Sequence, residues 1–316
     1  MRILVVGAGL MAGEHIKVLD ALKINYTVVG RSEGSAKKFE QMYGEKVLIG
    51  GLENVFESLE DNYTHAIIAT PLENLEENTL FLLKNGMKNI LLEKPGAVTK
   101  EGIEQIQNMA TANKANVYIA YNRRFYSSII EAKKRILEDG GLTSFLFEFT
   151  EWAHQIVKFN KTPFQLENWF IGNSTHVVDA AFYLGGEPRV LQGFSQNKLD
   201  WHPKGSIFVG SGMTVNDIPF SYHANWGAPG SWKLELLTSK NRYIFRPFEQ
   251  LHVQKIGSVV VDKVELDDQI DIQFKAGLYR QMEQFLFGTK YSELINIDET
   301  LRLHYWYKQI LNSHNN

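Results

Sequence analysis

The chain has 316 residues, a formal net charge of -3 and no cysteine. This length favours about two domains with a substantial hydrophobic core. The charge provides no basic field for a nucleic acid, and the lack of cysteine excludes disulfides, thiolate catalysis and cysteine-ligated metal sites. The apolar start is interrupted by glycines before it reaches the length of a signal-peptide core or a membrane span. We therefore expect a cytoplasmic protein that binds a small molecule rather than a nucleic acid or a membrane.

The first 120 residues alternate short apolar runs with helical patterns, which is typical of βαβ units on a parallel sheet. The expected strands are 2–6, 26–29, 46–49, 65–69, 89–92 and 116–120. Helices are expected between them, for example at 13–22 and at 73–85, where Gly86 ends the pattern. Residues 1–120 are therefore predicted to form a doubly wound, dinucleotide-binding Rossmann domain.

The pattern changes after Tyr121. Short apolar and alternating runs separated by turns predict a second α/β domain over 121–316, with a large, open and mainly antiparallel sheet. The expected strands are 142–152, 206–212, 218–226, 232–238 and 242–245, and the expected helices are 127–137, a segment ended by Gly288, and 299–311. The last helix is a candidate to pack back on the first domain. Residues 154–169 have weak periodicity and are expected to form a loop over the substrate site.

A glycine motif joins the first expected strand to the first helix. Gly7-Ala8-Gly9-Leu10-Met11-Ala12 matches the dinucleotide pattern G-x-G-x-x-G/A. The first glycine permits a tight turn, the second lets the backbone approach a pyrophosphate, and the small third residue lets helix and strand pack closely. Such a pattern can also be a simple turn, but here the strand, loop and helix occur in the right order. The sequence therefore predicts a dinucleotide site.

The residues after the second strand bear on which dinucleotide binds. Proteins that bind NAD usually carry an acidic residue there, whereas an arginine can accommodate the 2'-phosphate of NADP. This chain has Gly30-Arg31-Ser32, and no acid before Glu33. NADP is therefore favoured. The alternative is NAD, with Arg31 a solvated loop residue and Glu33 bound to the ribose.

Glu93-Lys94-Pro95 follows the expected strand 89–92. Ligands of open α/β sheets bind beyond the carboxyl ends of the strands, so Lys94 is expected to face the bound cofactor and substrate. Hydride transfer between nicotinamide and an alcohol or ketone needs a group that takes or gives the hydroxyl proton, and a lysine of lowered pKa can do this. The alternative is a surface lysine that merely follows a strand.

Further segments suggest a family. Ala69-Thr70-Pro71 follows the fourth strand, and the runs from Tyr121 to Phe125 and from His176 to Asp179 come later. Together with the glycine motif and Glu93-Lys94-Pro95, they make the chain similar to the glucose-fructose oxidoreductase, inositol dehydrogenase and MocA (Gfo/Idh/MocA) family. The resemblance implies an α/β domain whose open sheet forms a homodimer or homotetramer, with Lys94 and His176 as catalytic residues. The expected cofactor-binding residues are Gly7, Ala8, Gly9, Leu10, Met11, Ala12, Arg31, Ser32, Thr70, Pro71, Glu93 and Lys94.

One position departs from the family pattern, which usually has an aspartate four residues before the histidine. This chain has Gly172 there. Asn173 could bind a sugar hydroxyl instead, or Asn173 or Ser174 could be the N-cap of the helix that carries His176. A position in the first helical turn would keep His176 largely neutral. Asp179 either orients the histidine or lies exposed in the next turn.

Aromatic side chains of the second domain suit the apolar faces of sugar rings. The expected substrate-binding residues are Tyr121, Arg123, Trp152, Trp169 and Asn173. Arg123 could anchor a carboxylate or a phosphate, including the diphosphate of a nucleotide-linked sugar. No metal is expected. The sequence thus predicts an NAD(P)-dependent oxidoreductase acting on a sugar, a sugar derivative or a cyclic polyol. The alternatives are a dinucleotide-sensing regulator without catalysis and a reductase of a non-sugar carbonyl or imine.

Overall fold

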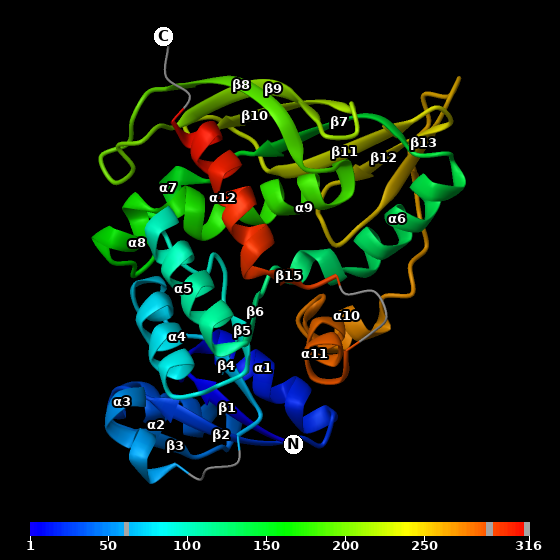
Figure 1. Ribbon diagram of the computed structural model, residues 1–316. Coiled ribbons are helices and arrows are strands. Elements are labelled where there is room, and N and C mark those ends of the chain that lie inside the picture. Colours follow the sequence, from blue (N-terminus) through cyan, green and yellow to red (C-terminus); the bar gives the residue numbers. More distant parts are fainter. Residues whose placement is uncertain (60–62, 289–292, 313–316) are drawn as a thin grey trace. The chain divides into compact units, whose positions relative to one another are not determined.

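A computed structural model describes residues 1–59, 63–288 and 293–312. The chain forms two compact units, Met1–Asn122 with Asp271–Leu301, and Arg123–Ile270 with Arg302–Asn316 (Figure 1). The first division lies close to the boundary predicted after residue 120. The prediction placed 121–316 in one domain, whereas Asp271–Leu301 groups with the first unit. It does so because helix α11, Leu278–Phe287, packs on the first helix and strand β15, Ile295–Asn296, pairs with strand β6.

A seven-stranded sheet forms the centre of the first unit, in the order β15-β6-β5-β4-β1-β2-β3. Its strands are β1 (Arg2–Val6), β2 (Asn25–Gly30), β3 (Val47–Ile49), β4 (His65–Ile68), β5 (Asn89–Leu92), β6 (Asn116–Ile119) and β15. The first six run parallel, and β15 runs antiparallel to β6. Residues in the centres of β1, β4 and β5 are fully buried, as continuous apolar runs in a covered parallel sheet should be. The predicted doubly wound sheet is confirmed.

Helices connect these strands and cover the sheet (Figure 1). They are α1 (Leu10–Ala21), α2 (Glu33–Tyr43), α3 (Leu52–Val55), α4 (Leu75–Lys84) and α5 (Lys100–Asn113), with 3-10 turns at Phe56–Ser58 and Leu72–Asn74. Serine and threonine side chains begin two of them. The hydroxyl oxygens of Ser32 and Thr99 accept hydrogen bonds from the backbone N–H groups of Ser35 and Gly102. The predicted helix at 13–22 begins earlier, at Leu10, because Gly9 is its N-cap.

The second unit contains an eight-stranded sheet in the order β14-β13-β12-β11-β7-β10-β9-β8. The strands are β7 (Leu142–Phe149), β8 (Pro188–Gln196), β9 (Ile207–Thr214), β10 (Pro219–Asn225), β11 (Trp232–Thr238), β12 (Asn241–Phe245), β13 (His252–Lys255) and β14 (Asp262–Lys263). In this sheet β7 pairs in parallel with β10, and the other described pairs of neighbouring strands are antiparallel. The predicted mainly antiparallel sheet is confirmed. The sequence analysis did not predict strands β8, β13 and β14. In β8 the apolar side chains of Val190 and Phe194 are exposed.

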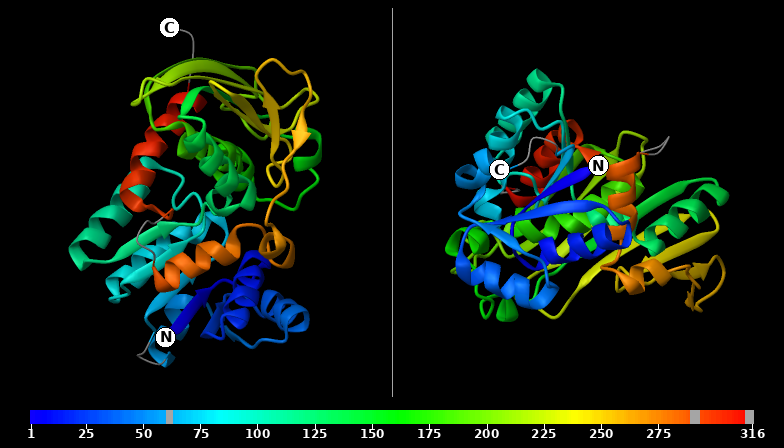
Figure 2. Two further views of the ribbon diagram at one scale, coloured as in Figure 1. Left: turned by 90° about the vertical axis from the view of Figure 1, so that its right-hand side faces the viewer. Right: turned by 90° about the horizontal axis from the view of Figure 1, so that it is seen from below.

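Helices of the second unit include α6 (Ser127–Glu138), α9 (Thr175–Gly185) and, largely, α12 (Ile297–Leu311), with a 3-10 turn at Asn122–Phe125. The short helix α10 (Gln269–Gln273) spans the division between the two units. Helix α9 packs on β7 and β11 (Figure 2). Phe145, Phe147 and Phe149 alternate along β7 and are buried, and the ring of Phe182 from α9 meets that of Phe147 edge-on. Burial of each such ring contributes roughly 1.5–3 kcal/mol. This core fixes the end of β7 relative to α9.

The loop predicted at 154–169 is wrong, because this segment contains two short helices, α7 (Ala153–Ile156) and α8 (Pro163–Glu167). Helix α8 begins where Thr162 accepts a hydrogen bond from the backbone N–H of Gln165 and where Pro163 occupies the first turn. Both signals are local and were present in the sequence. Within the described part of the chain, no helix is long and apolar enough to cross a membrane.

His202 should make stability depend on pH. It is fully buried, its Nδ1 lies 2.7 Å from the carbonyl oxygen of Gly205, and its ring packs on Trp226. Burial lowers the pKa of His202 from 6.5 to about 4. The unfolded chain therefore binds one more proton between these values, and the free energy of unfolding should fall by up to about 3 kcal/mol as pH drops from about 6.5 to about 4.

Unfolding in denaturant at neutral and acidic pH measures this effect. His202→Asn keeps a donor near Gly205 and cannot titrate, so its stability should depend less on pH. The same exchange at exposed His154 is the control. An unchanged pH dependence in His202→Asn would contradict the prediction.

Candidate functional site

The glycine motif lies at the carboxyl edge of the first sheet, between β1 and α1. Gly7 has φ +121°, and a Cβ there would lie 2.4 Å from the carbonyl oxygen of Ala69, so only glycine fits. Gly9 is the N-cap of α1, and a Cβ there would meet no heavy atom within 4 Å. The backbone N–H groups at the start of α1 are thus open to a close ligand. This loop fits the pyrophosphate of a dinucleotide.

The residues that follow β2 differ in whether their side chains are already engaged within the fold. Ser32 is used as the N-cap of α2, and its hydroxyl also lies 2.8 Å from that of Ser35. Glu33 lies in the first turn of α2, with its carboxylate 3.8 Å from the ammonium of Lys37. Arg31 is exposed, and no described residue forms an ion pair with its guanidinium. Of the two predicted phosphate ligands, Arg31 is therefore the one with its side chain available.

Lys94 lies just beyond β5, on the same sheet edge as the glycine motif. The backbone N–H of Glu93 donates to the carbonyl oxygen of Ile68 in β4 (2.9 Å), and the Lys94-Pro95 peptide is cis. The Glu93 carboxylate lies 3.2 Å from Nε2 of His15, a fully buried residue of α1. The turn that carries Lys94 is thus tied both to the neighbouring strand and to the helix of the glycine motif.

Thr70 and Pro71 follow β4 on this edge. The hydroxyl oxygen of Thr70 is buried and has no hydrogen-bond partner among the described residues. Buried hydroxyls are usually paired, so this one is available to a ligand. The predicted cofactor-binding residues therefore gather at the carboxyl ends of β1, β2, β4 and β5, where the strand order reverses between β1 and β4.

The second unit contains a pocket of about 590 Å³ at the end of β7. Trp152, Trp169 and Asn173, three of the predicted substrate-binding residues, line it together. Other lining residues are Glu151, Gln155 and Trp232. Aromatic walls with a few polar groups are typical of small-molecule sites. Tyr121, also predicted, is a buried residue of the first unit and is not part of this pocket.

Glu151 is the polar residue of this pocket that the sequence analysis missed. Its Oε1 accepts hydrogen bonds from the hydroxyl of Ser174 (2.7 Å) and from Nδ2 of Asn173 (3.1 Å). Burial raises the pKa of Glu151, and these donors together with the indole N–H groups of Trp169 and Trp232 oppose that shift. An acid directly after an alternating apolar strand was the available signal, but the predicted strand 142–152 ran past it.

The helix N-cap predicted at Asn173 or Ser174 is confirmed in position only: Ser174 directly precedes α9, but its side chain makes no capping hydrogen bond. A π-helical turn, Phe170–Ser174, leads directly into α9, and Ser174 has helical backbone angles, φ -65° and ψ -23°. A residue whose side chain caps a helix usually has an extended backbone, which Ser174 does not have. Both side chains instead donate to Glu151. His176 consequently does not lie at a free helix N-terminus, and the dipole argument for its neutrality falls away.

His176 and Arg123 both border Trp232 of the pocket. His176 is buried in α9, with its ring centroid 6.2 Å from that of Trp232, and the Arg123 guanidinium lies 4.6 Å from the Trp232 ring. Burial lowers the pKa of Arg123, and nearby groups that include Glu151 oppose that shift. The Nε of Arg123 is buried without a hydrogen-bond partner among the described residues. Arg123 thus keeps a donor for an anionic or hydroxylated ligand.

Asp179 is fully buried, so the alternative that it lies exposed is wrong. Its carboxylate accepts two hydrogen bonds from Arg124, from Nε to Oδ2 (2.9 Å) and from Nη2 to Oδ1 (2.6 Å). The neighbouring arginines therefore differ in function: Arg124 joins the 3-10 turn to α9, whereas Arg123 faces Trp232.

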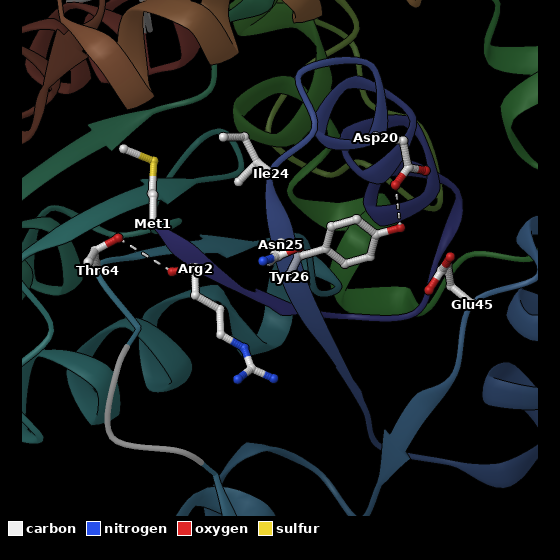
Figure 3. A pocket seen from close by; sticks show the side chains of 8 residues that line it. All are labelled: Met1, Arg2, Asp20, Ile24, Asn25, Tyr26, Glu45 and Thr64. Atoms are coloured by element: carbon white, nitrogen blue, oxygen red, sulfur yellow. Dashed lines mark hydrogen bonds between the residues drawn. The ribbon is translucent and has the colours of Figure 1, made fainter.

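Another pocket, of about 760 Å³, lies in the first unit at the amino ends of β1 and β2 (Figure 3). Figure 3 shows Tyr26 donating to Asp20 and Thr64 donating to the backbone oxygen of Arg2. Burial, with a smaller contribution from Asp20, raises the pKa of Tyr26. Because ligands of such sheets bind at the carboxyl ends, this pocket is on the wrong edge for the cofactor. The described residues contain no group of three His, Asp or Glu that could hold a metal ion.

Comparison with known proteins bears on the first unit most directly. Residues 1–121 match the family model of the Gfo/Idh/MocA group, an oxidoreductase family with an NAD-binding Rossmann fold. A curated relative, inositol 2-dehydrogenase 2 of Saccharopolyspora erythraea, is 25% identical over 197 residues, which cover 59% of this chain. The chain spans about half of that relative's length, 54%.

Solved structures resemble nearly the whole chain. An inositol dehydrogenase homolog from Azotobacter vinelandii, complexed with NADH and myo-inositol, has a TM-score of 0.76 at 18% identity and covers 99% of this chain and 95% of its own. A UDP-N-acetylglucosamine 3-dehydrogenase from Acidithiobacillus ferrooxidans has a TM-score of 0.77 at 14% identity, with 99% and 97% covered. At these identities the likeness establishes the fold. The resemblance seen in the sequence is confirmed.

Proposed function

Because residues 1–121 match the model of the Gfo/Idh/MocA oxidoreductase family, with its NAD-binding Rossmann fold, we propose that the protein is an NAD(P)-dependent oxidoreductase. Its substrate is a sugar, a sugar derivative such as a nucleotide-linked keto-sugar, or a cyclic polyol. The observation that carries the proposal is the position of Lys94 at the end of β5, on the sheet edge that holds the glycine motif. A sensor of dinucleotides would need the motif but no proton-transfer group.

In the proposed reaction the substrate exchanges both a hydride and a proton. Nicotinamide, when bound, accepts or supplies the hydride. Lys94 takes the proton from the substrate hydroxyl during oxidation and returns it during reduction, and His176 assists. Trp152, Trp169 and Trp232 suit the faces of a sugar ring, and polar Glu151 and Asn173 suit its hydroxyls. A flat apolar slot, expected for a non-sugar carbonyl, would lack such groups.

An activity panel tests this function. The protein is supplied with NADPH or NADH and keto-sugars, and with NADP+ or NAD+ and cyclic polyols, while the absorbance of the reduced nicotinamide is followed. We expect turnover of at least one polyhydroxylated substrate. Tight cofactor binding without turnover on any panel member would instead favour the dinucleotide-sensing regulator. Light scattering tests the proposed homodimer or homotetramer, and fractionation of the cells tests the cytoplasmic location.

Cofactor preference should depend on Arg31, since we propose that its guanidinium binds the 2'-phosphate of NADP. Arg31→Ala should weaken NADPH binding by roughly 10- to 100-fold, which is the value of a hydrogen bond to a charged group, and leave NADH binding nearly unchanged. Fluorescence titration with each cofactor measures the ratio. Lys88→Ala is the control, because Lys88 is an exposed cation that precedes β5 at the opposite sheet edge. If both variants keep the wild-type ratio, the NADP assignment is wrong.

A further inference from the structure

Glu151 is a buried carboxylate in the wall of the pocket of the second unit. Only 6% of the residue's surface is exposed. Its carboxylate has about four acceptor positions. Oε1 accepts hydrogen bonds from Ser174 and Asn173, whereas Oε2 has the longer contact of 3.3 Å with Asn173 Nδ2. Glu151 lines the pocket, so its remaining acceptor capacity is available to a molecule bound there.

A hydrogen-bond donor accompanies this acceptor. The indole Nε1 of Trp169 is buried and makes no hydrogen bond of good geometry to a described residue, but its N–H lies close enough to the Glu151 carboxyl to oppose the rise in that group's pKa. Trp169 lines the same pocket. A hydroxyl group can donate to a carboxylate and accept from an indole N–H at the same time. An aliphatic or purely aromatic ligand would exclude water from both groups without making these hydrogen bonds, at a cost in affinity.

The position of Glu151 is costly for folding. A buried carboxyl loses hydration, and an apolar or amide side chain in its place would avoid that cost. Burial does raise the pKa of Glu151, in agreement with this cost. Perturbed carboxyls of this kind gather at functional sites. The presence of Glu151 in a pocket wall therefore indicates a binding role.

Glu151 also bears on the carboxylate that the family pattern has at the position of Gly172. Its two partners, Asn173 and Ser174, directly follow Gly172 in the π-helical turn. The carboxyl of Glu151, which lies just beyond β7, thus contacts the π-helical turn that contains Gly172. We propose that Glu151 binds a hydroxyl of the sugar or cyclic polyol and supplies from β7 the carboxylate that is missing at Gly172. This inference rests on the proposed function.

The test compares Glu151→Gln with Glu148→Gln, a matched exchange within β7 at a residue that does not line the pocket. KM and kcat are measured with the best substrate of the panel and with its series of monodeoxy analogues. In Glu151→Gln, KM should rise about 10- to 100-fold for the full substrate. The variant should also lose the wild-type preference over one particular deoxy analogue, since the hydroxyl that Glu151 binds is absent there. A structural role alone would not remove discrimination at a single hydroxyl.

The affinity for the cofactor, measured by fluorescence, should be the same in both variants and shows that they are folded. If Glu151→Gln is not folded, Ser174→Ala replaces it, because this change removes the 2.7 Å contact and leaves the carboxyl in place. It should weaken the same discrimination. Active variants that keep wild-type KM and wild-type discrimination overturn the role of Glu151 and leave the proposed function intact. If the wild type neither turns over nor binds any polyol, judged by quenching of its tryptophan fluorescence, the proposed function fails and this role fails with it.

Discussion

Lys94→Ala is expected to lower kcat by about 100- to 10,000-fold, the usual contribution of a positioned proton-transfer group. Lys94 follows β5 directly, and the turn is held by the backbone bond from Glu93 to Ile68 and by His15 beside the Glu93 carboxylate. Alanine leaves these contacts in place and removes the ammonium group together with the chain that carries it. Affinity for the cofactor should therefore change little, whereas the transfer of the hydroxyl proton should become slow. Steady-state rates with the best substrate of the panel, together with cofactor titration, measure both quantities.

Two further variants make the result specific. Lys94→Arg keeps the positive charge, but a guanidinium does not give up its proton in proteins, so this variant should be nearly as slow as alanine. Lys100→Ala removes an exposed lysine that lies 3.0 Å from Glu104 at the start of α5, and it should keep wild-type activity. The rate of the wild type should also show an ionisation that both Lys94 variants lack. Wild-type kcat in Lys94→Ala would exclude proton transfer by this residue.

The first unit could be predicted closely because its signals are local. Strands such as Arg2–Val6 and Asn89–Leu92 are continuous apolar runs, and the structure gives them the predicted bounds. Gly7 identifies a turn that no other residue type serves as well, and Gly9 leaves the start of α1 open to a ligand, so the loop of the glycine motif could be located from sequence alone. Reassignment of Asp271–Leu301 to the first unit could not be foreseen, because the pairing of β15 with β6 joins segments far apart in the chain.

The pocket of the second unit was only partly predictable. Trp152, Trp169 and Asn173 were expected from their residue types, and the structure brings them into one pocket. Glu151 was missed because alternation along β7 made it part of a strand, whereas the strand ends at Phe149. The π-helical turn before α9 has no sequence rule as clear as a cap, so the side chain of Ser174 was interpreted as a cap. Both errors arise where tertiary contacts, here with a buried carboxyl, determine the local backbone.

Asp179→Asn is expected to destabilise the protein by about 3–5 kcal/mol, the usual cost of removing one partner of a buried ion pair. Asp179 is fully buried and Arg124 is 6% exposed, so the change leaves the guanidinium uncompensated in a medium of low dielectric constant. Unfolding in denaturant measures the loss. The double variant Arg124→Met with Asp179→Leu should be less destabilised than the sum of its single variants, because it leaves no buried charge.

A matched control is the exposed pair Arg189–Asp217, whose atoms are 2.6 Å apart and whose side chains are 56% and 75% exposed. Arg189→Met should cost less than about 1 kcal/mol. A loss in Asp179→Asn no larger than that of this control would contradict the assignment of a stabilising buried pair. The double variant Arg124→Met with Asp179→Leu also bears on catalysis, because Asp179 and His176 lie one turn apart in α9. If the double variant regains stability but not activity, Asp179 contributes to the site beyond holding α9 in place; if it regains both, its role is structural.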